Sequence, residues 1–408
     1  MHLLDVMNER GGPRRAAYLA HSHLGLDVAF VSEIARGKQI IRAVSGDAAS
    51  FGIAIGQESD SSETYCERLL RAEIPELIPD AAAEAGVAEL SLTRAARIGA
   101  YVGVPLRLAD GTAYGTLAGM SHAPDPSLSG RDVRFLSLLG DLIGPDLDDQ
   151  RRNEQLFDAF TQLIDSGRVT LASQPIVDIR SGSCLGVETL ARFPRPFGRP
   201  DRAFAAAYEV GLGLEVERLV VRKGWDLLPY ISHGQFLSMN LSPNALFKLA
   251  DRANGRSGLP LESLCIEITE HDVVENYAAM RRRLSSLRER GLRIAIDDAG
   301  AGYASLRHIV ELKPDYVKID RSLIHGIADD HARRVAVSAF VLLALDLDAT
   351  IIAEGVERAD DLATVRDLGV HAAQGYLIAK PSPRRADMLN WLGSPFRSVG
   401  ARDIGSFR

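Results

Sequence analysis

Short apolar runs mark the expected strands in the first part of the chain. Four of them are strand-like: residues 26–34, 38–44, 101–106 and 114–120. The last two are separated by Asp110-Gly111, a dipeptide that favours tight turns, so we expect a hairpin there. Over residues 131–142 the apolar positions recur with helical spacing, which predicts a helix packed against a sheet. The pattern predicts an α/β domain over residues 1–145 that is richer in hairpins than in alternating strands and helices.

The pattern changes in the second part of the chain. Residues 146–167 are polar at first and then amphipathic, which predicts a connecting helix. Over residues 168–408, apolar runs alternate with helical patterns, and eight runs are candidate strands: 170–179, 184–193, 236–241, 264–269, 293–296, 316–319, 350–353 and 371–378. Eight strands in about 250 residues are typical of a (β/α)₈ barrel. Only residues 180–183 separate the first two runs, so we expect a modified TIM barrel with one antiparallel strand.

Polar residues occur where the predicted barrel strands end. Asp297 and Asp298 directly follow an apolar run and precede a series of small residues. The other strand ends carry Glu188, Asn240, Glu267, Glu270, Lys318, Asp320, Glu354, Glu357 and Gln374. Because the carboxyl ends of barrel strands gather on one face, we expect these groups to converge. Several acids in one pocket repel one another unless a cation lies among them, and carboxylate oxygens suit Mg²⁺ or Mn²⁺.

Composition and charge narrow the class of protein. The chain has 408 residues, of which 46% are hydrophobic and 25% charged, as in ordinary globular proteins. A formal net charge of −7 argues against binding DNA or RNA through a basic surface. The cysteines Cys66, Cys184 and Cys265 form neither a disulfide framework nor a zinc motif, which fits a reducing cytoplasm. The N-terminus lacks the apolar core of a secretory signal, and no membrane span is expected.

Three segments of the first domain form a recognisable set: SETYCERLL from Ser62, the hairpin YVGVPLRLADGTAYGTLAG from Tyr101, and the closing helix RDVRFLSLLGDLI from Arg131. This set resembles a GAF domain. The resemblance implies a sensory or dimerising module with a pocket for an unknown small ligand over its sheet. Cys66 is then either a bilin attachment point or, as is more common for a single cysteine, a buried packing residue.

Eight motifs follow in order through the second part of the chain: QPIVD (174–178), ETLAR (188–192), NLSP (240–243), EITE (267–270), DDAGAGYAS (297–305), KIDRSLI (318–324), AEGVE (353–357) and QGYLIAKP (374–381). They resemble the EAL family of cyclic di-GMP phosphodiesterases, with ETLAR in place of the usual EALLR signature. The resemblance implies an enzyme that hydrolyses cyclic di-GMP to linear pGpG, with the GAF domain regulating it. No Gly-Gly-Asp-Glu-Phe run is present, so cyclase activity is not expected.

The resemblance also implies a role for each matching residue. Two divalent ions, Mg²⁺ or Mn²⁺, would be held by Glu188, Asn240, Glu267, Asp297, Asp298 and Glu354. The expected catalytic residues are Lys318, Glu354 and Asp298, and Lys318 would either position or deprotonate a water or neutralise developing charge. The substrate would contact Gln174, Arg192 and Gln374. Glu270 would hold the loop that begins at Ala299.

This loop departs from the family pattern. Ala299, Ala301 and Ala304 stand where the family usually has Phe, Thr and Ser, which removes apolar packing and hydroxyl hydrogen bonds. The alternative function is therefore a weakly active or inactive receptor that binds cyclic di-GMP and signals through a partner. The resemblance further implies a homodimer, and we expect no DNA, RNA or membrane partner.

Overall fold

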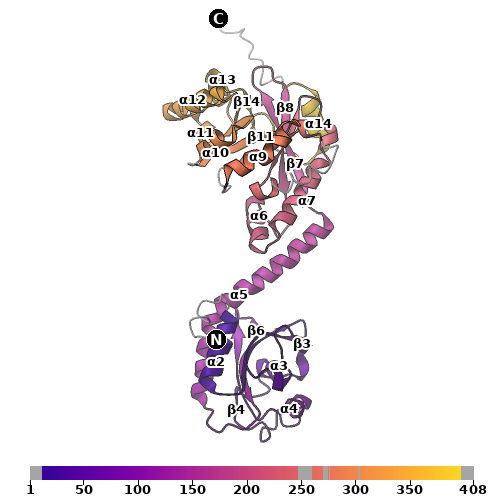
Figure 1. The fold of residues 1–408 in the computed structure, drawn as a ribbon, viewed down its shortest axis with the longest axis vertical. Helices are drawn as coiled ribbons and strands as arrows, with labels where there is room; N and C mark the ends of the chain where they lie inside the picture. Colours follow the sequence, from indigo (N-terminus) through magenta and orange to yellow (C-terminus); the bar gives the residue numbers. More distant parts are fainter. Residues whose placement is uncertain (1–11, 247–259, 270–273, 275, 302–303, 397–408) are drawn as a thin grey trace. The chain divides into compact units, whose positions relative to one another are not determined.

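The computed structural model describes residues 12–246, 260–269, 274, 276–301 and 304–396. Contacts between residues divide the chain into two compact units, Met1–Gln155 and Leu156–Arg408 (Figure 1). Each unit contains hydrophobic core clusters of its own. No helix in the described part of the chain combines the length and the apolar character needed to cross a lipid bilayer.

A six-stranded antiparallel sheet with the order β3-β2-β1-β6-β5-β4 forms the centre of the first unit. Its strands are β1 (Val28–Ala35), β2 (Lys38–Gly46), β3 (Glu58–Asp60), β4 (Leu77–Ile78), β5 (Ala100–Arg107) and β6 (Ala113–Ser121). The helices are α2 (Gly12–Leu24), α3 (Tyr65–Leu70), α4 (Ser91–Ala95) and α5 (Gly130–Ser166), with short 3₁₀ turns at Ala49–Phe51 and Ser61–Glu63. All four expected strands are present, and their ends lie close to the expected ones.

The two faces of this sheet have separate cores. On one face, Ala17 of α2 packs in the same core as Leu136 and Leu139 of α5, and Figure 1 shows both helices on this side. On the other face, Tyr65 and Leu69 of α3 pack against the sheet. The sheet is therefore covered on both sides, as expected for an α/β domain.

The hairpin between β5 and β6 is confirmed at the expected turn. Asp110 Oδ1 accepts a hydrogen bond from the Thr112 backbone N–H at 2.8 Å. Gly111 has φ of +82°, a left-handed conformation that glycine adopts without steric cost. The turn chemistry of the sequence thus fixes the register in which β5 pairs with β6.

The two helical segments expected over residues 131–142 and 146–167 form one helix, α5, which includes Pro145. Proline removes one helix hydrogen bond, but Ile143 and Leu147 on either side of it are buried in the core. The helix ends before Gly167, which has φ of +61° and donates its N–H to the Leu163 carbonyl oxygen at 2.9 Å.

The second unit is a closed eight-stranded barrel with the order β10-β11-β12-β13-β14-β7-β8-β9. Its strands are β7 (Thr170–Asp178), β8 (Cys184–Arg192), β9 (Phe236–Asn240), β10 (Leu264–Thr269), β11 (Arg293–Ala299), β12 (Tyr316–Ile319), β13 (Thr350–Ala353) and β14 (Ala372–Ala373). Strand β7 runs antiparallel to both of its neighbours, whereas all other pairs are parallel. The expected modified TIM barrel with one antiparallel strand is therefore confirmed.

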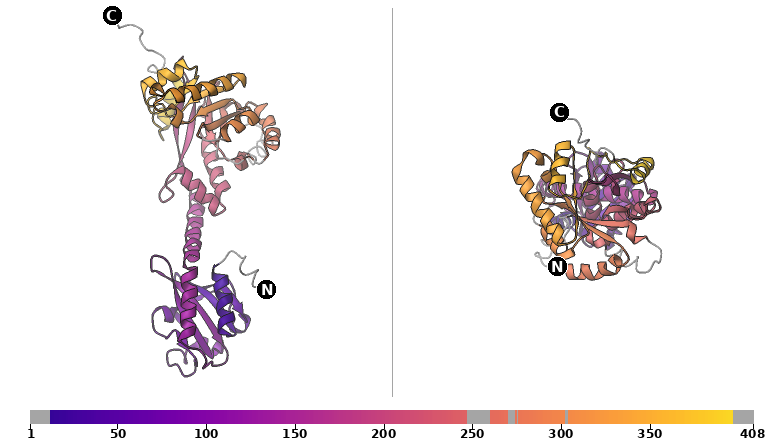
Figure 2. Two further views of the ribbon diagram at one scale, coloured as in Figure 1. Left: turned by 90° about the vertical axis from the view of Figure 1, so that its left-hand side faces the viewer. Right: turned by 90° about the horizontal axis from the view of Figure 1, so that it is seen from above.

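Helices follow the barrel strands along the chain: α6 (Pro200–Glu209), α7 (Gly213–Trp225), α9 (Tyr277–Arg288), α10 (Ala304–Leu312), α11 (Arg321–Ile324), α12 (His331–Asp346), α13 (Ala359–Asp367) and α14 (Arg385–Gly393). Short 3₁₀ turns lie at Leu228–Tyr230, Leu261–Ser263 and Ile327–Asp329. Figure 2 shows α12 and α13, in orange, on the outside of the strands. The barrel strands are thus buried between these helices and the interior.

The last barrel strand is shorter than expected. The apolar run predicted a strand over residues 371–378, but β14 comprises only Ala372–Ala373. At Gly375 the chain lies so close to the Val356 backbone that a Cβ atom would be 2.2 Å from the Val356 carbonyl oxygen. This close approach occurs where the chain leaves the ladder, a feature that an apolar pattern does not predict.

Candidate active site

The interior of the barrel contains an apolar layer next to a polar one. The rings of Phe236 on β9 and Tyr316 on β12 are 4.7 Å apart, although these strands are not neighbours, so both rings point inward. Ile176, Cys265, Ala295, Ile352 and Ala372 pack in the same cluster. Because side chains alternate along a strand, residues two positions away face the same interior. These residues are Gln174, Ser238, Glu267, Asp297, Lys318, Glu354 and Gln374.

Lys318 is fully buried, and its ammonium group contacts four carboxylates in the polar layer. Its Nζ atom lies 2.7 Å from Glu354 Oε1, 2.9 Å from Glu267 Oε2 and 3.0 Å from Asp297 Oδ1. The fourth carboxylate oxygen, Glu188 Oε2, is 3.5 Å away. The structure therefore brings acids from β8, β10 and β11 and from the residue after β13 around one lysine.

Two side-chain amides hold the Glu188 carboxylate. Asn240 Nδ2 donates to Glu188 Oε1 at 3.2 Å, and Gln374 Nε2 donates to Glu188 Oε2 at 2.6 Å. Gln374 Nε2 also donates to Gln174 Oε1 at 3.0 Å, and Gln174 Nε2 donates to the Ala379 carbonyl oxygen at 2.9 Å. Both glutamines that the sequence predicts as substrate contacts thus lie beside the acid cluster.

Ser238 is a site residue that the sequence analysis missed. It is buried on β9, and its Oγ donates to Glu267 Oε1 at 2.6 Å. Ser238 lies two positions before Asn240, so strand alternation places both side chains toward the interior. This alternation is the signal that could have identified it.

A β-bulge explains how the adjacent residues Asp297 and Asp298 both reach the site. In a regular strand their side chains would point to opposite faces. Here the pairing of β11 with β12 shifts between Ile296 and Ala299, and Asp298 has φ of +56°. Carboxylate oxygens of Asp297, Asp298 and Glu354 consequently lie within 4.8 Å of one another.

Burial and mutual repulsion change the pKa values in this cluster. Burial, followed by the Glu188 carboxylate, raises the pKa of Glu267 to about 8. Burial, followed by Asp297, raises the pKa of Glu354 well above its ordinary value. Burial opposes the charged form of Lys318, but the surrounding carboxylates outweigh it and raise the pKa of its ammonium group. One lysine does not compensate all of these carboxylates, so acids of the cluster retain protons when no further cation is bound.

The acid cluster fits divalent cations by its donor chemistry. Oxygens of Glu188, Glu267 and Asp297 also lie within 4.8 Å of one another, so Asp297 belongs to two sets of neighbouring acidic residues. All donors are hard oxygen atoms, which Mg²⁺ and Mn²⁺ prefer. Asn240, through its bond to Glu188, is adjacent to the first group. Each residue's role as a metal ligand stays a prediction.

Two other predicted site residues are not shown in this cluster. Arg192, the last residue of β8, donates Nη1 to the Ala191 carbonyl oxygen at 3.0 Å and is half-buried. Glu270 lies outside the described residues, so its predicted contact with the loop is not described. In that loop, Ala299 is fully buried, and the Gly300 N–H donates to Ser305 Oγ at 3.4 Å.

Glu217 on α7 is a second residue that the sequence analysis did not select. Its Oε2 accepts hydrogen bonds from the Ser242 backbone N–H at 3.3 Å and from Ser242 Oγ at 3.1 Å. Its Oε1 accepts from Tyr208 Oη at 2.5 Å. Because Ser242 follows Asn240 by two residues, Glu217 anchors the segment that carries this amide.

Curated proteins with similar sequences include two that are named for cyclic di-GMP hydrolysis. The chain is 29% identical over 244 residues to cyclic di-GMP phosphodiesterase PdeA of Borreliella burgdorferi, covering 57% of this chain and 36% of that protein. It is 32% identical over 235 residues to probable cyclic di-GMP phosphodiesterase PdeD of Escherichia coli, covering 54% of this chain and 43% of that protein. The chain thus spans less than half the length of these curated relatives.

Comparison with solved structures and family sequences agrees with the fold. The PaMucR phosphodiesterase in complex with c-di-GMP matches with a TM-score of 0.51 and 30% identity, covering 57% of this chain and 99% of that chain. A family sequence pattern for the GAF domain matches residues 14–145, and one for the EAL domain matches residues 154–381. The second match covers more than half of the chain, which therefore belongs to the EAL domain family and carries a GAF domain before its EAL domain.

Proposed function

We propose that this protein is a metal-dependent phosphodiesterase that adds water to one phosphodiester bond of cyclic di-GMP and releases linear pGpG. The observation that carries the proposal is that two sets of three acidic residues have Asp297 in common. One set is Glu188, Glu267 and Asp297, and the other is Asp297, Asp298 and Glu354. The names of the relatives and the bound ligand of the PaMucR structure support the same substrate. The expected cytoplasmic location belongs to this proposal, and the buried free thiols of all three cysteines support it.

In the proposed mechanism, one Mg²⁺ or Mn²⁺ ion would be held by Glu188, Asn240, Glu267 and Asp297, and a second would be held by Asp297, Asp298 and Glu354. When bound, such ions lower the pKa of a water and stabilise charge on the phosphoryl group. Ser238 fixes the orientation of the Glu267 carboxylate, and Gln374 fixes that of Glu188.

Lys318 is a catalytic residue in this proposal, together with Glu354 and Asp298. Its ammonium group already lies within 3.0 Å of oxygens from Glu267, Asp297 and Glu354, so it reaches the region where the phosphate would react. A cation held there orients a water by hydrogen bonding and offsets the negative charge that develops on phosphate oxygens. Arg192 would bind a second phosphate of the substrate with its planar guanidinium group, and Gln174 and Gln374 would contact the substrate.

A second candidate function is a receptor that binds cyclic di-GMP with little or no turnover. The observation that favours it is the loop after β11, which has Ala299, Ala301 and Ala304 in place of larger or hydroxylated residues. If Glu270 does not order this loop, the set formed by Asp297, Asp298 and Glu354 would be held less firmly, whereas the residues that contact the substrate would still bind it. In either case we propose that the GAF domain modulates the activity or the cyclic di-GMP binding of the barrel, and that the chain acts as a homodimer.

The test is a hydrolysis assay of the purified full chain with Mg²⁺ or Mn²⁺ and cyclic di-GMP, in which the nucleotide products are separated. We expect pGpG from the wild type and none from Asp297→Asn, which keeps the shape of the side chain but removes its charge. Asp346→Asn, at the exposed end of α12, is the matched control. Tight binding of cyclic di-GMP by the wild type without any pGpG would favour the receptor, and unchanged hydrolysis by Asp297→Asn would remove the metal assignment.

A further inference from the structure

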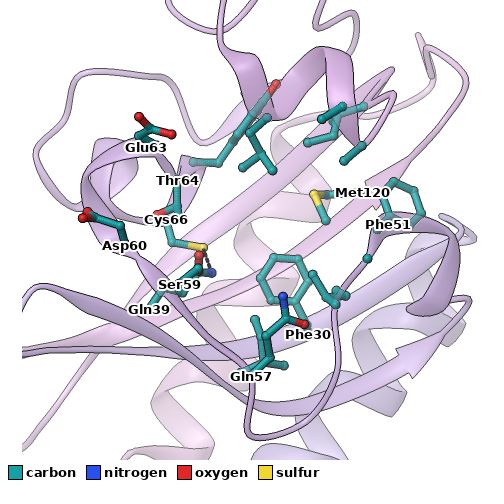
Figure 3. A pocket seen from close by; sticks show the side chains of 18 of the residues that line it. Phe30, Gln39, Phe51, Gln57, Ser59, Asp60, Glu63, Thr64, Cys66 and Met120 are labelled. Carbon is teal, nitrogen blue, oxygen red and sulfur yellow. Dashed lines mark hydrogen bonds between the residues drawn. The ribbon is translucent and has the colours of Figure 1, made fainter.

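The first unit contains a cavity of about 340 Å³ that lies on the face of the sheet covered by α3 and α4. Its walls come from the strands β1, β2 and β6, from both of these helices and from the segment after β2 (Figure 3). This volume falls in the range of pockets that bind small molecules. None of the residues proposed above for the acid cluster lines it.

Most of the cavity wall is apolar. Phe30, Phe51 and Met120 line the cavity (Figure 3), and Leu92 and Ile98 also contribute apolar surface to its wall. An apolar surface of this kind stabilises a ligand in proportion to the apolar area that the ligand removes from water. The body of a ligand that fills this cavity is therefore hydrophobic.

The charge of the cavity wall restricts the charge that a ligand can carry. No lysine, arginine or histidine lines the cavity, whereas the carboxylates of Asp60 and Glu63 do. Both acids belong to the segment that enters α3 and are solvent-exposed, so they lie at the rim. A phosphate or carboxylate on the ligand would meet negative charge without a compensating cation. The cavity therefore disfavours anionic ligands, phosphate-bearing nucleotides included.

Gln39 and Thr64 are buried polar side chains in the cavity wall, and the Thr64 hydroxyl is paired with the Ser61 carbonyl oxygen and the Glu67 N–H. Gln39 is 7% exposed, lines the cavity and donates Nε2 to Cys66 Sγ at 3.1 Å. Thr116 Oγ1 donates to the same sulfur at 3.0 Å, so the thiol is held by two donors. Within residues 12–246 the Gln39 carbonyl oxygen accepts no hydrogen bond. This oxygen is therefore available to a group inside the cavity, which favours a ligand that supplies a donor.

We propose that this cavity binds an apolar, non-anionic small molecule that carries one hydrogen-bond donor, with the donor directed at the Gln39 carbonyl oxygen. The inference identifies the chemical class of the ligand through which the GAF domain would act, and in that respect it rests on the proposed function. Binding itself requires neither divalent ions nor cyclic di-GMP, so it can be measured separately.

The test uses three probes that differ in one feature each: indole, 1-methylindole, which lacks the N–H donor, and indole-3-acetate, which adds a carboxylate. Calorimetric titration of the full chain is expected to give binding of indole about fivefold tighter than that of 1-methylindole, the size of one neutral hydrogen bond. Indole-3-acetate should bind most weakly. Tightest binding by indole-3-acetate, or no binding by any of the three, would overturn the inference.

Two variants test whether indole binds in this cavity. In Gln39→Leu, which keeps the shape but removes the acceptor, indole and 1-methylindole should bind equally. In Ala95→Trp, at the exposed edge of the cavity on α4, indole binding should be lost. Ala83→Trp, at an exposed position outside the cavity wall, should bind as the wild type does. Unchanged binding in Ala95→Trp, or a persistent preference for indole in Gln39→Leu, would contradict the site.

Hydrolysis of cyclic di-GMP is measured in parallel to keep the two proposals apart. Indole binding in the expected order, with hydrolysis that does not respond to it, would support the ligand site and contradict regulation by the GAF domain. Normal hydrolysis together with the failure of all three probes would overturn the ligand site alone. A change in hydrolysis on adding indole that is absent in Ala95→Trp would support both proposals.

Discussion

Glu267 shows how strongly one buried carboxyl depends on its neighbours. Burial, followed by the Glu188 carboxylate, raises its pKa from 4.5 to about 8, although Lys318 and the Ser238 hydroxyl oppose the shift. The folded, metal-free chain therefore holds a proton on Glu267 over a pH range in which the unfolded chain has released it. A divalent cation would compete with this proton for the same oxygens.

This competition predicts a pH-dependent effect of metal on stability. Because the folded state binds more protons than the unfolded state between about pH 5 and pH 8, the metal-free chain should lose stability as the pH rises through this range. A divalent ion replaces the proton, so Mg²⁺ should raise the melting temperature more at pH 8 than at pH 6. Thermal unfolding with Mg²⁺ or with a chelator checks this, and equal shifts at both pH values would contradict it.

Ser238 is predicted to tune the site without touching the substrate. Removing its hydroxyl in Ser238→Ala frees the Glu267 carboxylate from its 2.6 Å hydrogen bond. Loss of such a supporting contact typically weakens metal binding by about 10- to 100-fold. Titration of Mn²⁺ followed by electron paramagnetic resonance measures this directly. Ser263→Ala, a buried serine outside the site, is the control, and equal Mn²⁺ affinity in both variants would show that Ser238 has no such role.

Thr189, the unusual residue of the signature, is predicted to affect stability and not catalysis. Its Oγ1 donates to the Ser238 carbonyl oxygen at 2.8 Å, and the side chain is buried. Thr189→Ala should lower the free energy of unfolding by about 1 kcal/mol, the net value of one hydrogen bond, and leave hydrolysis unchanged. Urea unfolding and the hydrolysis assay check this, with Thr189→Ser, which keeps the hydroxyl, as the control. A large loss of hydrolysis in Thr189→Ala would contradict the prediction.

At the scale of single residues, the sequence predicts which residues belong to the site better than it predicts the contacts that they make. The acids at the strand ends could be predicted to converge because barrel geometry gathers those ends, and Glu188, Glu267 and Asp297 do lie together. Ser238 was missed because a serine in an apolar run carries no charge that draws attention. The position of Arg192 could not be predicted, since a long side chain at a strand end has several directions open to it.

At the scale of elements, the end of β11 determines the geometry of the site. A regular strand would present only one of Asp297 and Asp298 to the interior, and the bulge presents both. Position 300 favours glycine, because its φ is +102° and a Cβ atom there would lie 2.4 Å from Leu323 Cδ1. The sequence predicts the strand and the acids, but a bulge depends on pairing with β12 and is not evident in a pattern of period two.

The helix α7 is predicted to support the metal site through Glu217. Glu217→Ala removes the acceptor for both Ser242 donors and for Tyr208, so the segment of Asn240 should become less fixed. We expect about tenfold weaker Mn²⁺ binding, and Glu217→Gln should recover part of it because an amide oxygen still accepts hydrogen bonds.

Arg218→Ala, at the adjacent exposed position of α7, is the control for this prediction. It should bind Mn²⁺ as the wild type does. If Glu217→Ala lowered the melting temperature but left Mn²⁺ affinity unchanged, Glu217 would have only a structural role.

At the scale of the whole molecule, the chain consists of two units with separate cores. The expected boundaries at residues 145 and 167 stay predictions, and the helix α5 includes both of the segments expected around the first of them. The sequence did not indicate that α5 is continuous, because Pro145 and the polar residues after it are typical of a break. Burial of Ile143 and Leu147 offsets that local preference.

Separate cores predict separate unfolding transitions. Differential scanning calorimetry of the full chain should show two transitions, because each unit buries its own apolar residues. Addition of Mg²⁺ should raise the temperature of only one of them, since the carboxylate groups all belong to the barrel. A single transition that shifts as a whole would show that the two units unfold together.

The position of Lys318 separates the assembly of the barrel from its activation. The ammonium group compensates part of the charge of the acids from within the chain, so we expect the barrel to fold without an external ion. Under the proposed function, a newly made molecule would then persist in an inactive form until magnesium or manganese reached it. Metal supply would decide when this protein starts to work, and not whether it survives.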